Sequence, residues 1–251
     1  MRVAFQGEPG AYSEAAALEY FGKHIQSVPC ESFDVVFDRV LAGECEFGII
    51  PIENSLAGSI HRNYDLLLQN ELYIVGERYL RISHCLIAQP GVRVEDLRRV
   101  ISHPQALAQC ERFLRSLSEV RTEPAYDTAG SAKQIREQGW RDTAAVASRR
   151  AAEVYGMSVL AEAIEDNPAN YTRFLVIARS PVAGGPDAKT SIVFTANNVP
   201  GSLFKALSVF ALRDIDLTKI ESRPLVGKLW EYLFYIDFNG ASEEPQVKRA
   251  L

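Results

Sequence analysis

Short apolar runs alternate along the first part of the chain with segments in which apolar residues recur every three or four positions. The clearest helical segment follows Ser32, continues to Leu41 and has Gly43 just past its end. A second helix is expected to begin at Pro104. The expected strands are Val3–Gln6, Phe47–Ile50 (ended by Pro51), Leu72–Val75, Cys85–Ala88, Val100–Ile101, Thr143–Ala147 and Phe174–Ala178. This alternation predicts an α/β fold with largely parallel sheets.

A stretch of turn-forming residues without periodicity, Ser180–Asp187, separates this part from a shorter tail. The tail is expected to contain a strand at Ser191–Ala196, a helix at Gly201–Leu212 and a helix that begins near Ser242. Two further strands are expected between these helices, at Leu217–Ile220 and Tyr232–Phe238. This order predicts a ferredoxin-like α+β module that lacks its last strand.

Composition and charge argue against some classes of binding partner. The chain has 251 residues, a net charge of −5 and no cluster of Lys and Arg, so nucleic acid is not an expected partner. No apolar run approaches the roughly 18 residues that a membrane span needs. The four cysteines have no metal or redox spacing and lie beside apolar residues, which predicts buried reduced thiols and a cytoplasmic location.

Polar side chains follow the expected strands at the points where those strands end. They are Gln6, Asn54, Ser55, Ser102, Gln105, Asp127, Thr128, Ser131 and Ser148. In open α/β sheets ligands bind outside the carboxyl ends of the strands, and these hydroxyl and amide groups suit an anionic ligand. The alternative is that they only cap the helices that follow.

Other chemistries find little support in the sequence. The four histidines show no ligand spacing, which argues against a metal site. The segment Gly7–Gly10 lacks both the lysine of a phosphate-binding loop and the dinucleotide fingerprint, and no serine lies in a nucleophile elbow. In the helix after Pro104, Gln105 and Gln109 share a face that turns either to a cleft or to water. The residues alone therefore indicate an α/β domain for a small anion and an α+β appendage.

Seven stretches, in order along nearly the whole chain, share residue patterns with one enzyme family. They are Phe5–Ser13, Pro51–Ser55, Ser102–Cys110, Asp127–Ala132, Ala144–Ser148, Tyr171–Leu175 and Glu221–Pro224. Together they resemble prephenate dehydratase. One of them alone, such as the Thr-Arg-Phe tripeptide that begins at Thr172, would be weak, but seven in register are specific.

The resemblance implies two α/β lobes like those of a type II periplasmic binding protein, with the active site in the cleft between them. The catalytic domain would span residues 1–179, with lobe one at about 1–77 and 160–179 and lobe two at about 78–159. A linker at 180–189 would lead to a ferredoxin-like ACT domain at 190–251, which lacks the last strand of the family pattern.

The family's reaction removes CO₂ and the ring hydroxyl of prephenate together and yields phenylpyruvate, without a metal or other cofactor. Thr172 matches the threonine of the family motif and would donate a hydrogen bond to the departing oxygen, because a threonine hydroxyl is a poor acid. Asn54, Ser102 and Gln109 match the other catalytic positions and would fix the carboxylates and the ring. The implied substrate-binding residues are Arg173, as a positive charge, and Ser55, Thr128, Ser131 and Phe174.

The tail resembles an ACT domain, a module that often binds amino acids at a dimer interface. The positions that match the family's L-phenylalanine site are Gly201, Ser202, Leu203, Glu221, Ser222, Arg223 and Pro224. L-Phenylalanine would then be an allosteric effector, with a coupling free energy of about 1–3 kcal/mol. A homodimer or homotetramer is implied, with no nucleic-acid or membrane partner.

Two alternative functions stay open. Arogenate dehydratases share the architecture and resemble Asn54–Leu68 and Ser102–Glu111 as well. The ammonium group of their substrate would need a carboxylate or carbonyl partner, for which Glu53 and Asp127 are candidates. A non-catalytic amino-acid sensor would bind in the cleft without turnover, and the presence of the whole catalytic set argues against it.

Overall fold

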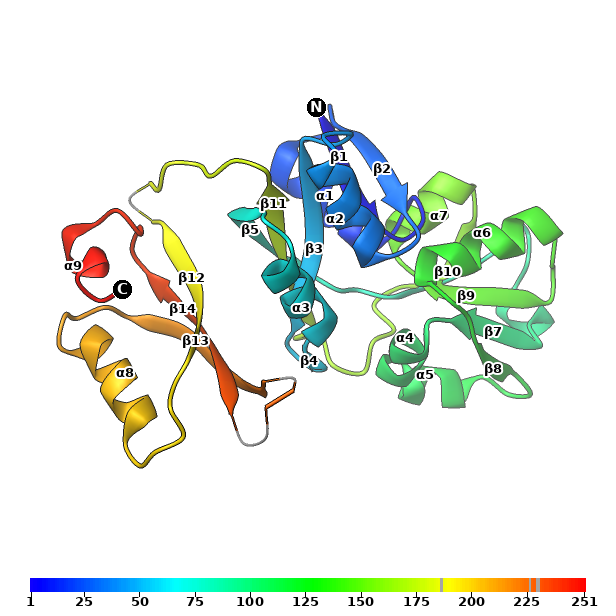
Figure 1. The fold of residues 1–251 in the computed structure, drawn as a ribbon. Helices are drawn as coiled ribbons and strands as arrows, with labels where there is room; N and C mark the ends of the chain where they lie inside the picture. Colours follow the sequence, from blue (N-terminus) through cyan, green and yellow to red (C-terminus); the bar gives the residue numbers. More distant parts are fainter. Residues whose placement is uncertain (186, 226, 229–230) are drawn as a thin grey trace. The chain divides into compact units, whose positions relative to one another are not determined.

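The structure, a computed structural model, describes residues 1–185, 187–225, 227–228 and 231–251. The chain divides into two compact units, Met1–Pro181 and Val182–Leu251 (Figure 1). Pro186, which belongs to the expected linker, lies outside the described residues. None of the helices found in the described ranges has the length and apolar character that a membrane span requires.

The first unit is built on two sheets. The first has the strand order β2-β1-β3-β11-β5, with β4 paired to β3. Its strands are β1 (Arg2–Gln6), β2 (Gln26–Cys30), β3 (Phe47–Asn54), β4 (Gly58–Ser59), β5 (Tyr73–Arg81) and β11 (Tyr171–Ala178). The second has the order β10-β6-β9-β7-β8. Its strands are β6 (Cys85–Ala88), β7 (Arg99–Ser102), β8 (Arg121–Pro124), β9 (Thr143–Ala147) and β10 (Ser158–Ala161).

The expectation of largely parallel sheets is wrong, because both sheets are mixed. Strand β1 runs parallel to β2 and β3, but β11 runs antiparallel to β3 and β5. In the second sheet β7 is parallel to β8 and β9, whereas β6 is antiparallel to β9 and β10. The cause is that the chain crosses twice between the sheets. By sheet membership it leaves the first sheet after Arg81 and the second after Ala161. The expected lobe boundaries near 77 and 160 stay predictions.

Helices flank both sheets (Figure 1). Those beside the first sheet are α1 (Tyr12–Phe21), α2 (Phe33–Leu41) and α3 (His61–Gln69). Those that belong with the second are the 3₁₀ helix η1 (Val94–Asp96), α4 (Pro104–Gln109), α5 (Glu111–Ser116), α6 (Thr128–Gln138) and α7 (Arg149–Tyr155). Helix α2 is confirmed as predicted, since Ser32 Oγ accepts from the Val35 N–H at 3.4 Å and the helix buries Val36, Phe37 and Val40.

The helix expected after Pro104 is two short helices. The backbone at Cys110 adopts φ −118° and ψ 21°, so α4 ends at Gln109 and α5 starts at Glu111. The apolar spacing is continuous through this break, and for that reason periodicity alone predicts one helix. The break leaves Gln109 at a helix end.

Pro51 does not end the strand that begins at Phe47. Strand β3 continues to Asn54, and its pairing with β11 shifts register where Phe174 faces Pro51 and Arg173 faces Glu53. Ile52 is the extra residue of this bulge. A proline removes one N–H from the ladder, and a bulge is a position where a strand tolerates that loss.

One cluster of buried apolar residues connects the two sheets. It joins Phe5 and Ile49 of the first sheet to Ile87 and Ala145 of the second. A separate cluster, which includes Leu86, lies on the opposite face of the second sheet. The four cysteines are buried and free, and burial raises the pKa of the Cys110 thiol to about 12. The expectation of buried reduced thiols is confirmed.

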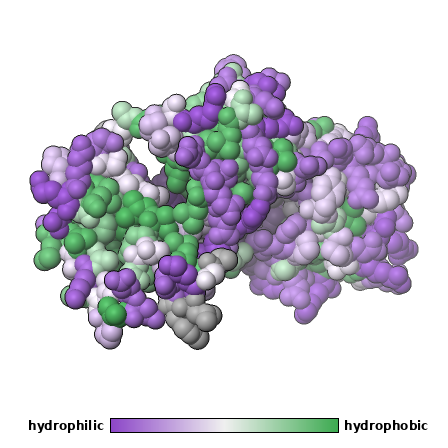
Figure 2. All heavy atoms as spheres, viewed as in Figure 1, coloured by the Kyte–Doolittle hydropathy of each residue, from purple (hydrophilic) through white to green (hydrophobic). Residues whose placement is uncertain are grey.

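The second unit is an α+β module. Its described elements are β12 (Lys189–Thr195), α8 (Ser202–Ala211), β13 (Leu217–Pro224), β14 (Tyr232–Asn239) and α9 (Pro245–Lys248). The sheet order is β12-β14-β13, with antiparallel pairs, and Phe210, Ile236 and Phe238 form the centre of its core. Figure 2 shows apolar residues gathered on the visible surface of this unit; Phe204 and Leu212 are among its exposed apolar side chains.

Contacts beside α1 hold the two lobes of the first unit together. A Cβ on Gly10 would lie 2.7 Å from Ala151 Cα, so the loop before α1 packs directly on α7. The buried Glu14 carboxylate accepts hydrogen bonds from Arg150 Nε at 2.8 Å, the Gly10 N–H at 2.8 Å and Ser27 Oγ at 2.7 Å. Burial alone would raise the pKa of Glu14, but these hydrogen bonds outweigh it and hold the pKa below its ordinary value.

The substitution Glu14→Gln should therefore lower the free energy of unfolding by about 3 kcal/mol at neutral pH, because it leaves Arg150 without its buried partner. A carboxyl group whose pKa is lower in the folded state stabilises the fold at pH values above its unfolded pKa. The difference in unfolding free energy between wild type and Glu14→Gln should therefore vanish as acid protonates Glu14. Urea unfolding at several pH values measures this. The matched control is Glu19→Gln on the same helix, whose exposed pair with Arg78 should contribute under about 1 kcal/mol. Equal losses in the two variants would contradict the prediction.

Candidate active site

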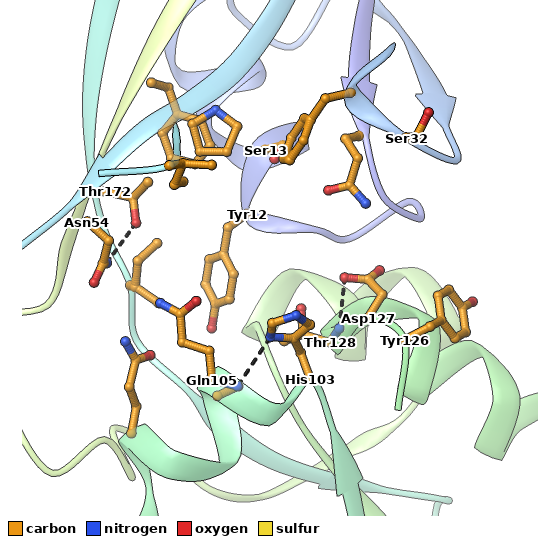
Figure 3. A pocket seen from close by; sticks show the side chains of 18 of the residues that line it. Tyr12, Ser13, Ser32, Asn54, His103, Gln105, Tyr126, Asp127, Thr128 and Thr172 are labelled. Carbon is orange, nitrogen blue, oxygen red and sulfur yellow. Dashed lines mark hydrogen bonds between the residues drawn. The ribbon is translucent and has the colours of Figure 1, made fainter. Parts of the chain in front are cut away.

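A cavity of about 560 Å³ lies between the sheets of the first unit (Figure 3). Residues of the first sheet and its helices line one side, namely Tyr12, Glu31, Ser32, Pro51, Asn54, Thr172 and Phe174. His84, from the segment that leads from the first sheet to the second, lies on the other side. The second lobe contributes the rest of that side, namely His103, Gln105, Gln109, Asp127 and Thr128. The expected cleft is thus present, with both lobes contributing polar groups.

The strand register brings two of the expected catalytic residues together. Thr172 on β11 lies opposite Asn54 at the end of β3. Asn54 Nδ2 donates to Thr172 Oγ1 at 3.0 Å, and this bond is drawn in Figure 3. Because the threonine oxygen accepts this hydrogen bond, its own hydrogen stays available for an acceptor in the cleft.

Backbone groups fix the orientation of the Asn54 side chain. Its Oδ1 accepts from the Leu56 N–H at 3.1 Å and the Ala57 N–H at 3.0 Å. A backbone N–H can only donate, so the amide nitrogen must point the other way, toward Asn170 Oδ1, the Tyr171 carbonyl oxygen and Thr172 Oγ1. The loop after β3 therefore turns the amide nitrogen, and not the amide oxygen, toward Thr172.

Gln109 is held by two buried side chains. Its Oε1 lies 3.0 Å from His84 Nε2 and 3.0 Å from Asn170 Nδ2. His84 Nδ1 in turn lies 2.8 Å from the hydroxyl of Tyr12. Burial lowers the pKa of His84, although the hydrogen bond to Gln109 and the charge of Glu165 oppose this effect. Burial also raises the pKa of Tyr12 well above its ordinary value, so both groups are neutral near pH 7.

Several polar groups at the strand ends cap helices, as the alternative reading holds. Asp127 accepts from the N–H groups of Thr128 at 2.8 Å and Gly130 at 3.1 Å, and Ser148 Oγ accepts from the Ala151 N–H at 2.9 Å. Asp127 therefore places a carboxylate at the start of α6, where an anionic ligand would otherwise be favoured. Thr128 lines the cleft beside it.

Four of the residues expected at the site are engaged by other groups of the protein. Ser102 and Ser131 are fully buried and donate to the carbonyl oxygens of Val146 at 2.6 Å and Asp127 at 2.7 Å. Ser55 is exposed and donates to the Ala169 carbonyl oxygen at 2.8 Å. Arg173 is buried, and its Nη2 lies 2.8 Å from Glu77 on β5. None of these four is among the described residues that line the cleft, whereas Thr172, Asn54, Gln109, Thr128 and Phe174 are.

Sequence reasoning missed Tyr12, His84 and Asn170. Tyr12 lies in one of the stretches that carry the family resemblance, yet nothing local distinguishes it from a core tyrosine. His84 fits no metal-ligand spacing, and only the fold brings it to Gln109. Asn170 directly precedes the Tyr171–Leu175 stretch, and that position is the one signal that could have identified it.

The expected phenylalanine motif of the second unit divides between two faces of β13. Residues from Leu217 to Pro224 alternate in exposure. Glu221 and Arg223 lie opposite Tyr235 and Leu233 of β14, whereas Ser222 and Pro224 lie opposite Phe234 and Tyr232 and thus on the other face. Gly201 precedes α8 with φ 83°, a conformation that favours glycine, and Ser202 begins the helix. The assignment of these residues to an effector site stays a prediction.

Comparison with known proteins identifies the family. A family model described as prephenate dehydratase matches residues 3–182, and one described as ACT domain matches residues 190–251. This chain belongs to the prephenate dehydratase family. Like its relatives, it joins a lyase-type catalytic domain to an ACT domain, as the sequence resemblance implied.

Individual relatives agree with this assignment. Arogenate dehydratase/prephenate dehydratase 2 of Arabidopsis thaliana, a chloroplastic protein, is 52% identical over 262 residues, which cover 100% of this chain and 68% of that protein. The structure of prephenate dehydratase from Arthrobacter aurescens in complex with L-Phe has a TM-score of 0.89 and 32% identity, covering 100% and 84% of the two chains. A structure described as GqqA, a novel type of quorum quenching acylase, has a TM-score of 0.91 and 37% identity, covering 100% and 92%.

The low pKa of His84 predicts a specific pH dependence of stability. A histidine whose pKa is lower in the folded state binds its proton more readily when unfolded, so folding stability should fall as the pH drops below about 6.5. His84 is the buried one of the four histidines. The difference in unfolding free energy between wild type and His84→Gln should therefore change as the pH falls below about 6.5. A difference that is independent of pH would contradict the neutral state of His84.

Proposed function

We propose that this protein removes CO₂ and the ring hydroxyl of prephenate to form phenylpyruvate. The observation that carries the proposal is the Asn54–Thr172 hydrogen bond at 3.0 Å, since it leaves the Thr172 hydrogen free to be donated to the departing oxygen. The full-length similarity to dehydratases supports the same reaction class.

In this reaction the main task of the protein is to orient the substrate. The bond between the ring and its carboxylate breaks, and its electron pair becomes part of the aromatic ring as the C–O bond to the hydroxyl breaks. The hydroxide leaves toward Thr172, and one proton taken up from the bulk solvent converts it to water, so that the products are phenylpyruvate, CO₂ and water. A hydrogen bond that strengthens as negative charge develops on this oxygen stabilises the transition state more than the ground state.

Apolar residues of the cleft favour loss of the carboxylate. Pro51, Ile60, Ile82, Ala106 and Phe174 all line it. A carboxylate is poorly solvated in such surroundings, whereas CO₂ is neutral, so the charge spread in the transition state is less penalised than the localised charge of the substrate. The other carboxylate is proposed to bind the amide hydrogens of Gln109, since the oxygen of this amide is already engaged by His84 and Asn170.

The variant Thr172→Ala should lower kcat by about 10²-fold, similar to the removal of one donor from an oxyanion site, with a smaller change in KM. Thr172→Ser keeps the hydroxyl and is the matched control, expected to retain most of the activity. Steady-state kinetics with prephenate measures both variants. If Thr172→Ala turned over as fast as Thr172→Ser, the hydroxyl would have no part in the reaction.

Arogenate is a second candidate substrate, because the cleft carries carboxylates and no described Lys or Arg lines it. Asp34 lies beside Arg62, and Asp127 caps α6, so both are engaged. Glu31 is exposed at the cleft, and an ammonium group could pair with it. The name of the Arabidopsis relative includes both activities. Of the partners expected earlier, Glu53 is not among the lining residues.

Parallel assays with prephenate and arogenate should give phenylpyruvate from prephenate well above the acid-catalysed background. Glu31→Gln should raise KM for arogenate severalfold and leave KM for prephenate unchanged, because only arogenate carries the ammonium group. Faster formation of phenylalanine from arogenate would make this an arogenate dehydratase. Turnover of neither substrate would favour a non-catalytic sensor.

The remaining proposals concern regulation, assembly and location. L-Phenylalanine is proposed as an effector bound by the ACT domain, on the strength of the L-Phe complex of the Arthrobacter enzyme; the same assays with added L-phenylalanine test this, and an unchanged rate would contradict it. A homodimer or homotetramer is proposed, which sedimentation can measure. The cytoplasm stays the predicted compartment, supported by the free thiols.

The acylase described for GqqA finds no support in this cleft. Acyl transfer by a serine or cysteine needs a base in hydrogen-bond contact with the nucleophile. Of the lining histidines in the described chain, His84 bonds to Tyr12 and Gln109, and His103 accepts from the Gln105 N–H at 3.3 Å. Neither has a serine or cysteine partner among the described residues.

A further inference from the structure

Six side chains form one unbroken row of hydrogen bonds between the lobes. They are Thr172, Asn54, Asn170, Gln109, His84 and Tyr12, and neighbours in the row are 2.8 to 3.0 Å apart. Thr172 and Asn54 belong to the first sheet and Tyr12 to α1. Gln109 ends α4 in the second lobe, and His84 and Asn170 lie in the two segments by which the chain crosses between the sheets.

The direction of every bond in the row follows from its fixed end. Asn54 Oδ1 is occupied by backbone donors, so Asn54 Nδ2 donates to Asn170 Oδ1 at 2.8 Å. The other half of the Asn170 amide is then its nitrogen, which donates to Gln109 Oε1. That oxygen also faces His84 Nε2, which must therefore carry a hydrogen.

The same argument fixes the far end of the row. With its hydrogen on Nε2, neutral His84 has a lone pair on Nδ1, so the Tyr12 hydroxyl donates to it. Tyr12 also lies 2.8 Å from the Ser83 carbonyl oxygen, which would accept the same hydrogen if Gln109 and His84 were reversed. Because backbone donors hold Asn54, this reversal would require an acceptor in place of the Asn170 nitrogen.

We propose that His84, as its neutral Nε2–H tautomer, and Asn170 are positioning residues that orient the Gln109 amide so that both of its N–H groups face the substrate. This proposal rests on the proposed function in one respect, the binding of an anionic carboxylate in the cleft. Neither Asn170, which is fully buried, nor the Nε2 of His84, which is bonded to Gln109, needs to touch the substrate.

The surroundings of His84 keep it neutral and in place. Its backbone N–H donates to Glu165 at 2.9 Å, and its carbonyl oxygen accepts from the Ile164 N–H at 3.1 Å. The charged or titratable groups that act on His84 or on its partner Tyr12 are Tyr12 itself from α1, Cys85 from β6, Cys110 after α4, and Glu165, which pairs with Arg81. The titratable residues that line the same cleft are Glu31, Asp34, His103, Tyr126 and Asp127. The Glu165 carboxylate accepts from the backbone N–H of His84, and the imidazole ring bonds to Tyr12 and Gln109.

The decisive variant is Asn170→Asp, which has nearly the same shape and removes the donor. A carboxylate at this position accepts from Asn54 and from Gln109, so the Gln109 amide must turn over and donate to His84 Nε2. The hydrogen of His84 then moves to Nδ1, and the Tyr12 hydroxyl turns to Ser83. Gln109 would present its oxygen to the substrate carboxylate, and kcat/KM should fall about 10-fold or more.

The tautomer can be read directly from ¹⁵N spectra of histidine-labelled protein at about pH 8, above the ordinary histidine pKa of about 6.5. The His84 signals are assigned by their loss in His84→Gln. Wild type should show the hydrogen on Nε2, and Asn170→Asp should show it on Nδ1. Tyr12→Phe should keep the wild-type tautomer, because Gln109 and not Tyr12 determines it. Wild-type His84 with its hydrogen on Nδ1, or an unchanged tautomer in Asn170→Asp, would overturn the proposal.

Kinetic controls separate this proposal from the proposed function. Asn167→Asp places the same charge in the same crossing segment at an exposed residue, and its kcat/KM should stay within about twofold of wild type. His84→Gln, which can still donate to Gln109, should be more active than His84→Phe at equal stability. Equal activity of these two would contradict the positioning role. Lack of wild-type turnover would refute the proposed function alone, since the spectra do not depend on it.

Discussion

The antiparallel register between β3 and β11 is the constraint on which the site depends. It places Thr172 opposite Asn54, and it brings the segment before β11, with Asn170, against the loop after β3. Because β11 is the strand by which the chain returns from the second lobe, the same pairing also fixes where the two lobes meet. A change of register by one residue would turn Thr172 to the opposite face of the sheet and separate it from Asn54.

Local signals in the sequence predict the elements well and the arrangement of strands poorly. Helix α2 and strands β6 and β9 follow from periodicity, capping and composition, which act over a few residues. The continuation of β3 through Pro51 depends on a partner strand more than 100 residues away in the chain, and the antiparallel pairs of the second sheet join residues more than 50 positions apart. No local pattern encodes either. The same limit applies to the site. The motifs contain Thr172, Asn54 and Gln109, which line the cleft, and give no sign that the hydroxyls of Ser102 and Ser131 bond instead to carbonyl oxygens.

The electrostatics of the cleft differ from the simple expectation for an anion site. Arg173, the expected cation, pairs with Glu77, and the start of α6 is occupied by Asp127. In the proposed mechanism binding therefore relies on neutral donors, the hydroxyl of Thr172 and the amide of Gln109, which line the cleft together with apolar side chains. Neutral donors hold an anion less tightly than a guanidinium group does, which suits a reaction in which one carboxylate must be lost as CO₂.

The row of hydrogen bonds from Thr172 to Tyr12 has a consequence for how this sequence can change over time. The orientation of each amide or imidazole in the row is set by its neighbours, because Asn54 donates to both of its neighbours and Gln109 accepts from both of its own. A substitution that reverses one member is tolerated only when every member beyond it can turn as well. Positions as far apart in the chain as Tyr12 and Asn170 are therefore expected to vary together among relatives. No motif of neighbouring residues would show that these positions depend on one another.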